Sequence, residues 1–202
     1  MRKTVSLIGR PNTGKSSLFN RLINEKKSII DDQAGVTRDR IYGIVNYEDK
    51  SFNLIDTGGI DLEKATFNEN IKMQAELAID ESDLIVFVID GKEDLTSNDL
   101  LISSLLKKSN KEVIVAVNKL DEKHMNNNIY NYYELGFDAY YPVSAEHNKG
   151  IKELLNAITK DFNPYTTEED DATLKFSLIG RPNVGKSSLV NALLNEERSI
   201  VS

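Results

Sequence analysis

The 202-residue sequence contains no cysteine, no tryptophan and only 2 histidines, His124 and His147. Without cysteine, the chain can form no disulfide, thiolate zinc site, iron–sulfur cluster or thiol nucleophile. So few imidazoles also argue against a metal site built on histidine. Positive charge is in deficit, because 25 lysines and arginines face 32 acidic residues and give a formal net charge of −7. A field of that sign repels phosphate backbones, which disfavours general nucleic-acid or DNA binding.

Long hydrophobic runs are also missing. The longest, Leu84 to Ile89, is far below the roughly 20 residues that a membrane-spanning helix needs. The basic N-terminus, Met1 to Thr4, is followed by an apolar run too short for a signal peptide. We therefore expect a cytoplasmic protein without a membrane partner. The chain length suits one domain with a piece left over.

A long-period internal repeat predicts the domain organisation. The segment from Ser6 to Leu18 returns as Ser177 to Leu189, with one exchange of threonine for valine. A repeat with this period is typical of a duplicated domain rather than of a short solenoid unit. The intervening residues 163–173 are polar and acidic with one proline, as in a linker. We predict a complete first domain at 1–162, a linker at 163–173 and the truncated start of a second domain at 174–202, and we expect the natural protein to continue beyond Ser202.

Within the first domain, short apolar segments alternate with helical patterns. The expected strands are 4–8, 41–47, 52–56, 84–90, 113–117 and 139–143, and the expected helices are 16–24, 68–81, 98–109, 127–135 and 150–162. The runs 84–89 and 113–117 are apolar at every position, as in strands covered on both faces. This order predicts an α/β fold with a mostly parallel six-stranded sheet between helices. Ligands of such sheets bind beyond the carboxyl ends of the strands.

The first copy of the repeat contains a phosphate-binding pattern. Residues 9–16 read GRPNTGKS between an apolar strand and an amphipathic helix, which is the context of a P-loop. Glycines let backbone N–H groups curl around phosphate oxygens, Lys15 neutralises the β and γ phosphates, and the Ser16 hydroxyl can hold Mg²⁺. A glycine turn without a ligand is the alternative, but a second copy makes a chance match negligible. The predicted nucleotide contacts are Gly9, Arg10, Pro11, Asn12, Thr13, Gly14, Lys15 and Ser16, and their counterparts Gly180, Arg181, Pro182, Asn183, Val184, Gly185, Lys186 and Ser187.

Further polar motifs follow three other predicted strands. Asp56, Thr57, Gly58, Gly59 and Ile60 lie at the end of the third strand, where a carboxylate can hold a Mg²⁺-bound water and a glycine amide can reach a γ-phosphate.

The remaining two motifs predict guanine recognition. They are Asn118, Lys119, Leu120 and Asp121 after the fifth strand, and Ser144 and Ala145 after the sixth. The Asp121 carboxylate can accept both the N1–H and the exocyclic amine of guanine, and adenine offers neither donor in that arrangement. The backbone N–H at Ser144–Ala145 can donate to the guanine O6.

In this order, the motifs resemble those of the translation-factor-type GTPases. The motif that completes the set would be Thr37, within GVTRD at 35–39, whose hydroxyl and carbonyl would close on Mg²⁺ and the γ-phosphate. The second P-loop makes the chain similar, over essentially its whole length, to bacterial tandem-domain members of the TrmE-Era-EngA-like GTPases, which carry two G domains and a C-terminal KH-like domain. The resemblance implies a G domain of the P-loop NTPase class, GTP or GDP as ligand, Mg²⁺ held by Ser16, Thr37 and Asp56, and a role in assembly of the large ribosomal subunit through C-terminal parts.

The expected catalytic residues are Lys15, Thr37 and Gly59, but one usual part is missing. Ras-like enzymes place a water-orienting glutamine after this glycine, and here the residue is Ile60. The resemblance suggests K⁺ held by Asn12 as a replacement, giving slow, potassium-stimulated hydrolysis. A turn residue that stabilises the P-loop is the equal alternative for Asn12. An arginine from 38–40 is a weaker candidate than solvated loop charges.

Two other functions compete with GTP hydrolysis. The first is a nucleotide-gated switch with negligible turnover, which Ile60 favours. The second is an ATPase, which Asn118 and Asp121 oppose. The repeat at Gly180–Ser187 has no guanine-reading partner within the chain, so we expect it to bind nucleotide poorly. Asp90 is expected to cap the loop into the next helix, and His147 to be solvated.

Overall fold

The computed structural model describes residues 2–24, 41–57, 67–120 and 129–164. The chain divides into one unit at Met1–Tyr165 and another at Thr166–Ser202, and all described residues belong to the first. Residues 165–173 of the predicted linker and the second P-loop lie outside the described residues, so the predicted three-part organisation stays a prediction.

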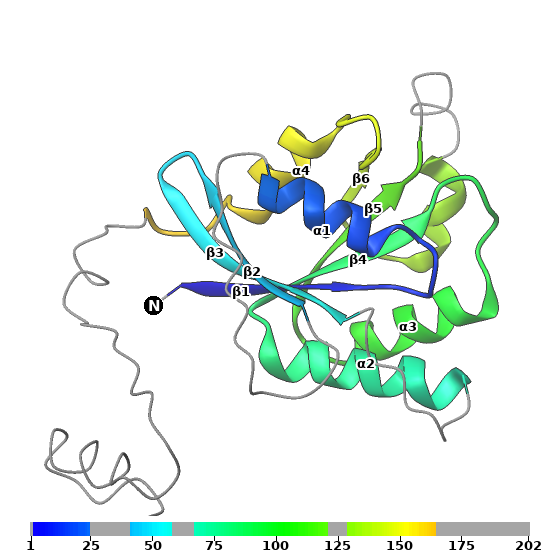
Figure 1. Cartoon of the computed structure of the whole chain (residues 1–202). Coiled ribbons are helices and arrows are strands. Elements are labelled where there is room, and N and C mark those ends of the chain that lie inside the picture. Colours follow the sequence, from blue (N-terminus) through cyan, green and yellow to red (C-terminus); the bar gives the residue numbers. More distant parts are fainter. Residues whose placement is uncertain (1, 25–40, 58–66, 121–128, 165–202) are drawn as a thin grey trace, which may run out of the picture. The chain divides into compact units, whose positions relative to one another are not determined.

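The first unit alternates strands and helices along the chain (Figure 1). The elements are β1 (Lys3–Ile8), α1 (Lys15–Asn24), β2 (Ile41–Tyr47), β3 (Lys50–Asp56), α2 (Phe67–Glu81), β4 (Leu84–Asp90), α3 (Ser97–Lys107), β5 (Glu112–Asn118), η2 (Ile129–Leu135), β6 (Tyr140–Pro142) and α4 (Ile151–Ile158). All six predicted strands are present, with ends that shift by at most two residues.

The strands form one six-stranded sheet in the order β2-β3-β1-β4-β5-β6. Only β2 runs antiparallel to its neighbour β3, as expected for a hairpin, and the other pairings are parallel. This confirms the predicted mostly parallel sheet. Leu7 pairs with Asp56 across β1 and β3, and Asp90 pairs with Asn118 across β4 and β5. The polar residues that end these strands therefore meet at one edge, where α/β sheets bind ligands.

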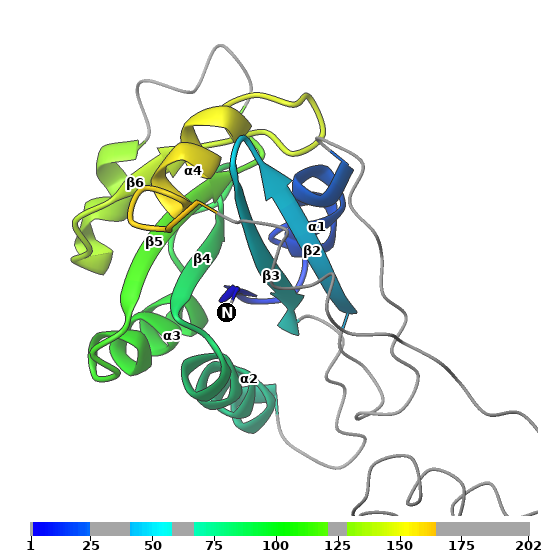
Figure 2. The same ribbon diagram turned by 90° about the vertical axis from the view of Figure 1, so that its left-hand side faces the viewer.

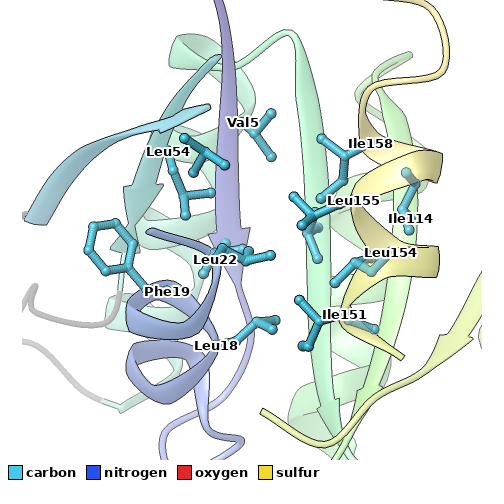
Figure 3. Packing of buried hydrophobic residues seen from close by; sticks show 14 of the residues in the cluster. Val5, Leu18, Phe19, Leu22, Leu54, Ile114, Ile151, Leu154, Leu155 and Ile158 are labelled. Carbon is cyan, nitrogen blue, oxygen red and sulfur yellow. The ribbon is translucent and has the colours of Figure 1, made fainter. Parts of the chain in front are cut away.

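Helices cover both faces of the sheet, with α1 and α4 on one side and α2 and α3 on the other (Figures 1 and 2). Figure 3 shows Leu18 and Leu22 of α1 and Leu154 and Leu155 of α4 pointing toward the sheet, where Val5 of β1 lies. On the opposite face, the sheet packs against side chains from α2, α3 and η2. Residues of β4 are buried at every position, which explains its uninterrupted apolar run.

Two helix predictions need correction. The segment expected to be an α-helix at 127–135 is a 3₁₀ helix over its described part, Ile129–Leu135. It closes on Gly136, whose left-handed φ of 66° ends the turn. The helix expected at 150–162 begins after Gly150, with φ 69°, and ends at Ile158. Thr159 stops it, because its hydroxyl donates to Leu155 O at 2.9 Å and its backbone leaves the helical region.

Among the described residues, no helix is both long and apolar enough to cross a membrane.

Candidate nucleotide-binding site

The predicted phosphate loop connects β1 to α1, and its shape depends on two glycines. A Cβ on Gly9 would lie 2.2 Å from Val88 O of the neighbouring strand β4. Gly14 has a φ of 87°, and a Cβ there would lie 2.3 Å from Asn118 Nδ2. Asn12 also adopts a left-handed φ, of 65°. These positions explain why the loop sequence places glycine where it does.

Lys15 opens α1 and lies buried beneath the loop. Its Nζ donates to Gly9 O and to Arg10 O, each at 2.9 Å. Burial lowers the pKa of Lys15, the nearby charge of Asp56 opposes that shift, and Arg10 adds to it. A buried ammonium that donates to carbonyls gains from an anion placed at the loop.

Ser16 and Asp56 come together from α1 and the end of β3. The Ser16 hydroxyl donates to Asp56 Oδ2 at 2.9 Å, and Asp56 is buried. A hydroxyl and a carboxylate are oxygen ligands of the kind that Mg²⁺ prefers, so this pair fits the predicted metal role. Thr57, predicted as a nucleotide contact, instead donates its hydroxyl to Leu7 O at 2.8 Å and ties β3 to β1.

Asn118 joins the phosphate loop to the predicted base loop. Its Nδ2 donates to Thr13 O at 2.9 Å, and its Oδ1 accepts from the Ala145 N–H at 3.1 Å. The residue is only 2% exposed. A buried amide whose two ends are both engaged fixes the separation of the two loops. The N–H predicted to reach guanine O6 is thus held by Asn118 in this structure.

A pocket of about 110 Å³ lies next to Asn118. It is lined by Gly14, Ser17, Lys92, Asn118, Lys119, Ser144, Ala145, Glu146 and His147. The lining combines the end of the phosphate loop with both predicted base motifs. His147 is exposed, as predicted for a solvated side chain, but it also lines this pocket.

Lys119 connects three parts of the site. Its Nζ donates to Asn12 O in the phosphate loop and to Asp90 Oδ2 at the end of β4, at 2.5 and 2.6 Å. The expectation that Asp90 caps the loop into the next helix is correct only in part. Its Oδ1 accepts from Lys92 N–H within the loop, but the N-cap of α3 is Thr96.

Arg10, predicted to contact nucleotide, points to carboxylates near α3. Its Nη2 donates to Glu93 Oε2 at 2.5 Å, and its Nε donates to Asp99 Oδ2 at 3.2 Å. Partial burial by itself lowers the pKa of Arg10, but the hydrogen bond to Glu93 and the charge of Asp99 raise it above the ordinary value. The structure therefore links the phosphate loop to the first turn of α3 through this side chain.

Several predicted contacts have other surroundings or lie outside the described residues. Pro11 is exposed, Thr13 is buried and donates its hydroxyl to Arg10 O, and the buried Leu120 donates its N–H to Val143 O. The other residues predicted to contact the nucleotide or Mg²⁺ lie outside the described ranges: Thr37, Gly58, Gly59, Ile60, Asp121 and Gly180–Ser187.

Sequence reasoning missed three side chains that shape the site: Glu93, Asp99 and Arg21. The Arg21 guanidinium donates to the carbonyls of Ala145 and Glu146. Only Asp99 had a local signal, because Thr96 and Asp99 form a capping box. The partners of the others lie far away along the chain.

The comparisons with known proteins agree with this geometry. The family model described as 50S ribosome-binding GTPase matches residues 4–119 and 175–202. The chain belongs to this GTPase family. Membership makes it a GTP-binding protein with an α/β G domain, and it confirms the family resemblance predicted from the sequence motifs.

Curated relatives match the whole chain. GTPase Der of Listeria innocua is 50% identical over 203 residues, which cover 100% of this chain and 46% of that protein. GTPase Der of Oceanobacillus iheyensis is 53% identical over 204 residues, covering 100% and 47%. The chain thus spans about half the length of the curated relatives that it matches.

Solved structures show the same fold. A variant of Aquifex aeolicus Era bound to GDP.AlF4- has a TM-score of 0.64 and 30% identity, over 82% of this chain and 59% of that chain. The G domain of the T. maritima FeoB iron transporter has a TM-score of 0.59 and 28% identity, over 79% and 98%. These matches confirm the predicted fold class.

Proposed function

We propose that this chain binds GTP with Mg²⁺ at the edge of the sheet and hydrolyses it to GDP and phosphate. The observation that supports the proposal is the double hydrogen bond of Asn118, which joins Thr13 of the phosphate loop to Ala145 of the proposed base loop. A phosphate-binding loop alone would suit any nucleoside triphosphate. The base pocket beside it supplies the means to select guanine.

The phosphate half acts through charge and position. The Lys15 ammonium donates hydrogen bonds to the phosphate oxygens instead of to the loop carbonyls. The negative charge of the phosphates then removes the cost of burying an unneutralised ammonium. Ser16 and Asp56 would hold Mg²⁺, and Thr37 would be the third ligand. When bound, Mg²⁺ neutralises charge that develops on the phosphates during transfer. The backbone amide of Gly59 is proposed to meet the γ-phosphate.

The base half selects guanine through hydrogen-bond polarity. The Asp121 carboxylate accepts from the N1–H and the exocyclic amine, and the Ala145 N–H is shared between Asn118 and the guanine O6. An adenine in this pocket would leave the carboxylate unpaired and would present an amine to the N–H donor. Such mismatches between buried polar groups give strong discrimination.

Hydrolysis requires attack of water on the γ-phosphorus, with cleavage of its bond to the bridging oxygen of GDP. Ile60 has no polar group with which to orient that water, so we infer slow turnover. We further infer that K⁺ held by Asn12 stimulates the reaction by supplying positive charge beside the phosphates. Asn12 is exposed and its backbone takes a left-handed turn, which supports its placement at the rim of the loop.

The test is phosphate release from GTP, with ATP as the control nucleotide, in KCl and in NaCl of equal ionic strength. The repeat supplies a matched pair of variants, Lys15→Met and Lys186→Met. We expect turnover of GTP only, faster in KCl, and lost by about a hundredfold or more in Lys15→Met. Lys186→Met should behave like wild type, because the second P-loop has no base-reading partner in this chain. Equal rates for GTP and ATP would contradict the proposal, and equal rates in KCl and NaCl would contradict the role of K⁺.

The second candidate is a nucleotide-gated switch with negligible turnover, which the Ile60 position favours. In that case GTP and GDP would bind tightly and no phosphate would appear in either salt.

The biological role that we propose is assembly of the large ribosomal subunit in the cytoplasm. It is supported by membership in a family described as 50S ribosome-binding GTPases and by the Der relatives. Sedimentation of the full-length protein with large subunits, with GDP or a non-hydrolysable GTP analogue, tests this role. We expect association that depends on the nucleotide and is lost in Lys15→Met.

A further inference from the structure

Arg21 reaches from α1 to the loop that follows β6. Its Nε donates to Ala145 O at 2.9 Å, and its Nη2 donates to Glu146 O at 3.1 Å. The planar guanidinium presents donors in a fixed fork, so two bonds from one side chain restrict the position of two successive carbonyls. The contact joins residues that are 124 positions apart in the sequence.

The two carbonyls belong to the wall of the base pocket. Ala145 and Glu146 line the pocket, while Arg21 is not among the described residues that do. Arg21 therefore acts on the wall without lining the pocket itself. Its bond to Ala145 O complements the bond between Ala145 N–H and Asn118 Oδ1. Because peptide planes are rigid, holding both the N–H and the C=O of Ala145 fixes both of its backbone dihedrals.

Other contacts also hold this loop, because the Ala145 N–H donates to Asn118 Oδ1 at 3.1 Å and the His147 N–H donates to Ser144 Oγ at 3.4 Å. Ser144 and Lys149 exchange backbone hydrogen bonds of 2.9 and 3.1 Å, and Gly150 lets the chain turn close to Pro142 O, from which a Cβ would be 2.1 Å away. Between Ser144 and Lys149, the side chains of Glu146 and His147 are exposed. The Arg21 fork thus holds the carbonyl side of the Ala145–Glu146 segment, and Asn118 holds its Ala145 N–H.

We propose that Arg21 is a positioning residue for recognition of the oxygen at position 6 of the guanine base. The inference rests on the proposed function, because it places guanine against Asn118 and Ala145. Arg21 holds the loop so that the Ala145 N–H keeps its direction when the base arrives. Asp121, which is proposed to read the N1–H and the amine, belongs to a different motif and keeps its role when Arg21 changes.

Because Ala145 and Asp121 are proposed to recognise different atoms of guanine, a change in one of them can be detected separately. A merely structural role of Arg21 would not change the relative affinities of different purine nucleotides. A general loosening of the fold lowers the binding affinity of all purine nucleotides by the same factor. Loss of orientation at Ala145 weakens only those ligands that present an oxygen at position 6. The informative probes are GDP, IDP, which lacks only the exocyclic amine, and 6-thio-GDP, which replaces only the oxygen by sulfur, a poorer acceptor.

The experiment compares the full chain with its Arg21→Lys variant, which keeps the charge and loses the fork. Asn20→Ala, an exposed neighbour on the same helix, is the control. Dissociation constants for the three diphosphates are measured in MgCl₂, and thermal unfolding checks that each variant folds. We expect Arg21→Lys to raise the dissociation constants of GDP and IDP by about tenfold each, so that the ratio of these two constants stays unchanged. The dissociation constant of 6-thio-GDP should rise by less than about threefold. Asn20→Ala should match wild type.

Two results would overturn the inference. One is an equal loss for all three ligands, which would mean that Arg21 only supports the fold. The other is no change for any of them. If Arg21→Lys fails to fold, Arg21→Gln, which keeps one donor amide, is measured in the same way with the same expected pattern. A wild-type chain that binds none of the three would instead refute the proposed function, and the inference with it.

Discussion

In the phosphate half of the site Lys15 makes local contacts, whereas Asn118 and Arg21 in the base half join distant parts of the chain. Lys15 bonds to carbonyls five and six residues away. Asn118 bonds to Thr13 across 105 residues, and Arg21 bonds to Ala145 across 124. A local loop can be duplicated together with its short sequence, as the repeat at Gly180–Ser187 illustrates. The pocket beside Asn118 requires the rest of the domain, so the proposed guanine selectivity would depend on the whole fold.

The largest effect is expected where the two halves touch, at Gly14. In Gly14→Ala the new Cβ would press against Asn118 Nδ2, at a φ that side chains disfavour. We expect a loss of about 1–3 kcal/mol in the free energy of unfolding and a drop of about a hundredfold in GDP affinity. Gly136→Ala is the control, because Gly136 also has a left-handed φ but its Cβ would meet only the flexible end of Lys107. It should lose stability and retain GDP binding, and equal affinities in the two variants would contradict this account.

Asn118→Ala tests the link itself. Removing the amide leaves the Ala145 N–H and the Thr13 carbonyl without these partners, at a cost of about 1–3 kcal/mol in the free energy of unfolding. We expect the dissociation rate of GDP to rise by about ten- to a hundredfold. Asn118→Asp keeps the acceptor for Ala145 but sets a buried carboxylate against the Thr13 carbonyl, so its loss should be at least as large as that of Asn118→Ala. If GDP dissociated from Asn118→Asp as slowly as from wild type, the bond between Asn118 and Thr13 would not contribute to GDP binding.

A smaller effect on GDP affinity is expected at Arg10, whose contacts with Glu93 and Asp99 lead away from the pocket. Arg10→Met leaves the buried Asp99 without its cation, which should lower the free energy of unfolding by about 1.5–3 kcal/mol. GDP affinity should fall far less than in Gly14→Ala. Glu93→Gln removes the exposed partner, 57% accessible, and should cost no more than about 1 kcal/mol. Urea unfolding of both variants measures the difference, and a larger loss in Glu93→Gln would reverse the assignment.

The smallest effect concerns the titration of Lys15. Because burial lowers its pKa, the folded, nucleotide-free protein binds fewer protons than the unfolded chain up to the ordinary lysine pKa of about 10.4. The contribution of Lys15 to stability therefore rises with pH through this window. We expect the free energy of unfolding of wild type minus that of Lys15→Met to increase as the pH rises toward the ordinary lysine pKa of about 10.4. A difference that stayed level or fell would contradict the buried, charged lysine.

The same contrast explains how far the sequence alone led. The strand pattern, the P-loop and the order of the motifs are local, so the sheet and the meeting of Ser16 with Asp56 followed from them. Three side-chain bonds depend on how distant parts of the chain come together, and no local sequence pattern predicts them. They join Arg10 to Glu93, Lys119 to Asp90 and Arg21 to Ala145. The 3₁₀ helix at Ile129–Leu135 was missed for a related reason. The Tyr132 hydroxyl donates to the carbonyls of Asp90 and Glu93, and the hydrophobic periodicity of the sequence does not predict this contact.

Calorimetric titration of the chain with GDP, and separately with ADP, in MgCl₂ tests the central claim most directly. The proposed arrangement is a guanine site in the first domain and a second P-loop, at Gly180–Ser187, that is expected to bind nucleotide poorly. It predicts binding of a single GDP per chain and no measurable binding of ADP at the same concentrations. Two GDP per chain, or ADP bound as tightly as GDP, would contradict the claim that the base half selects the ligand.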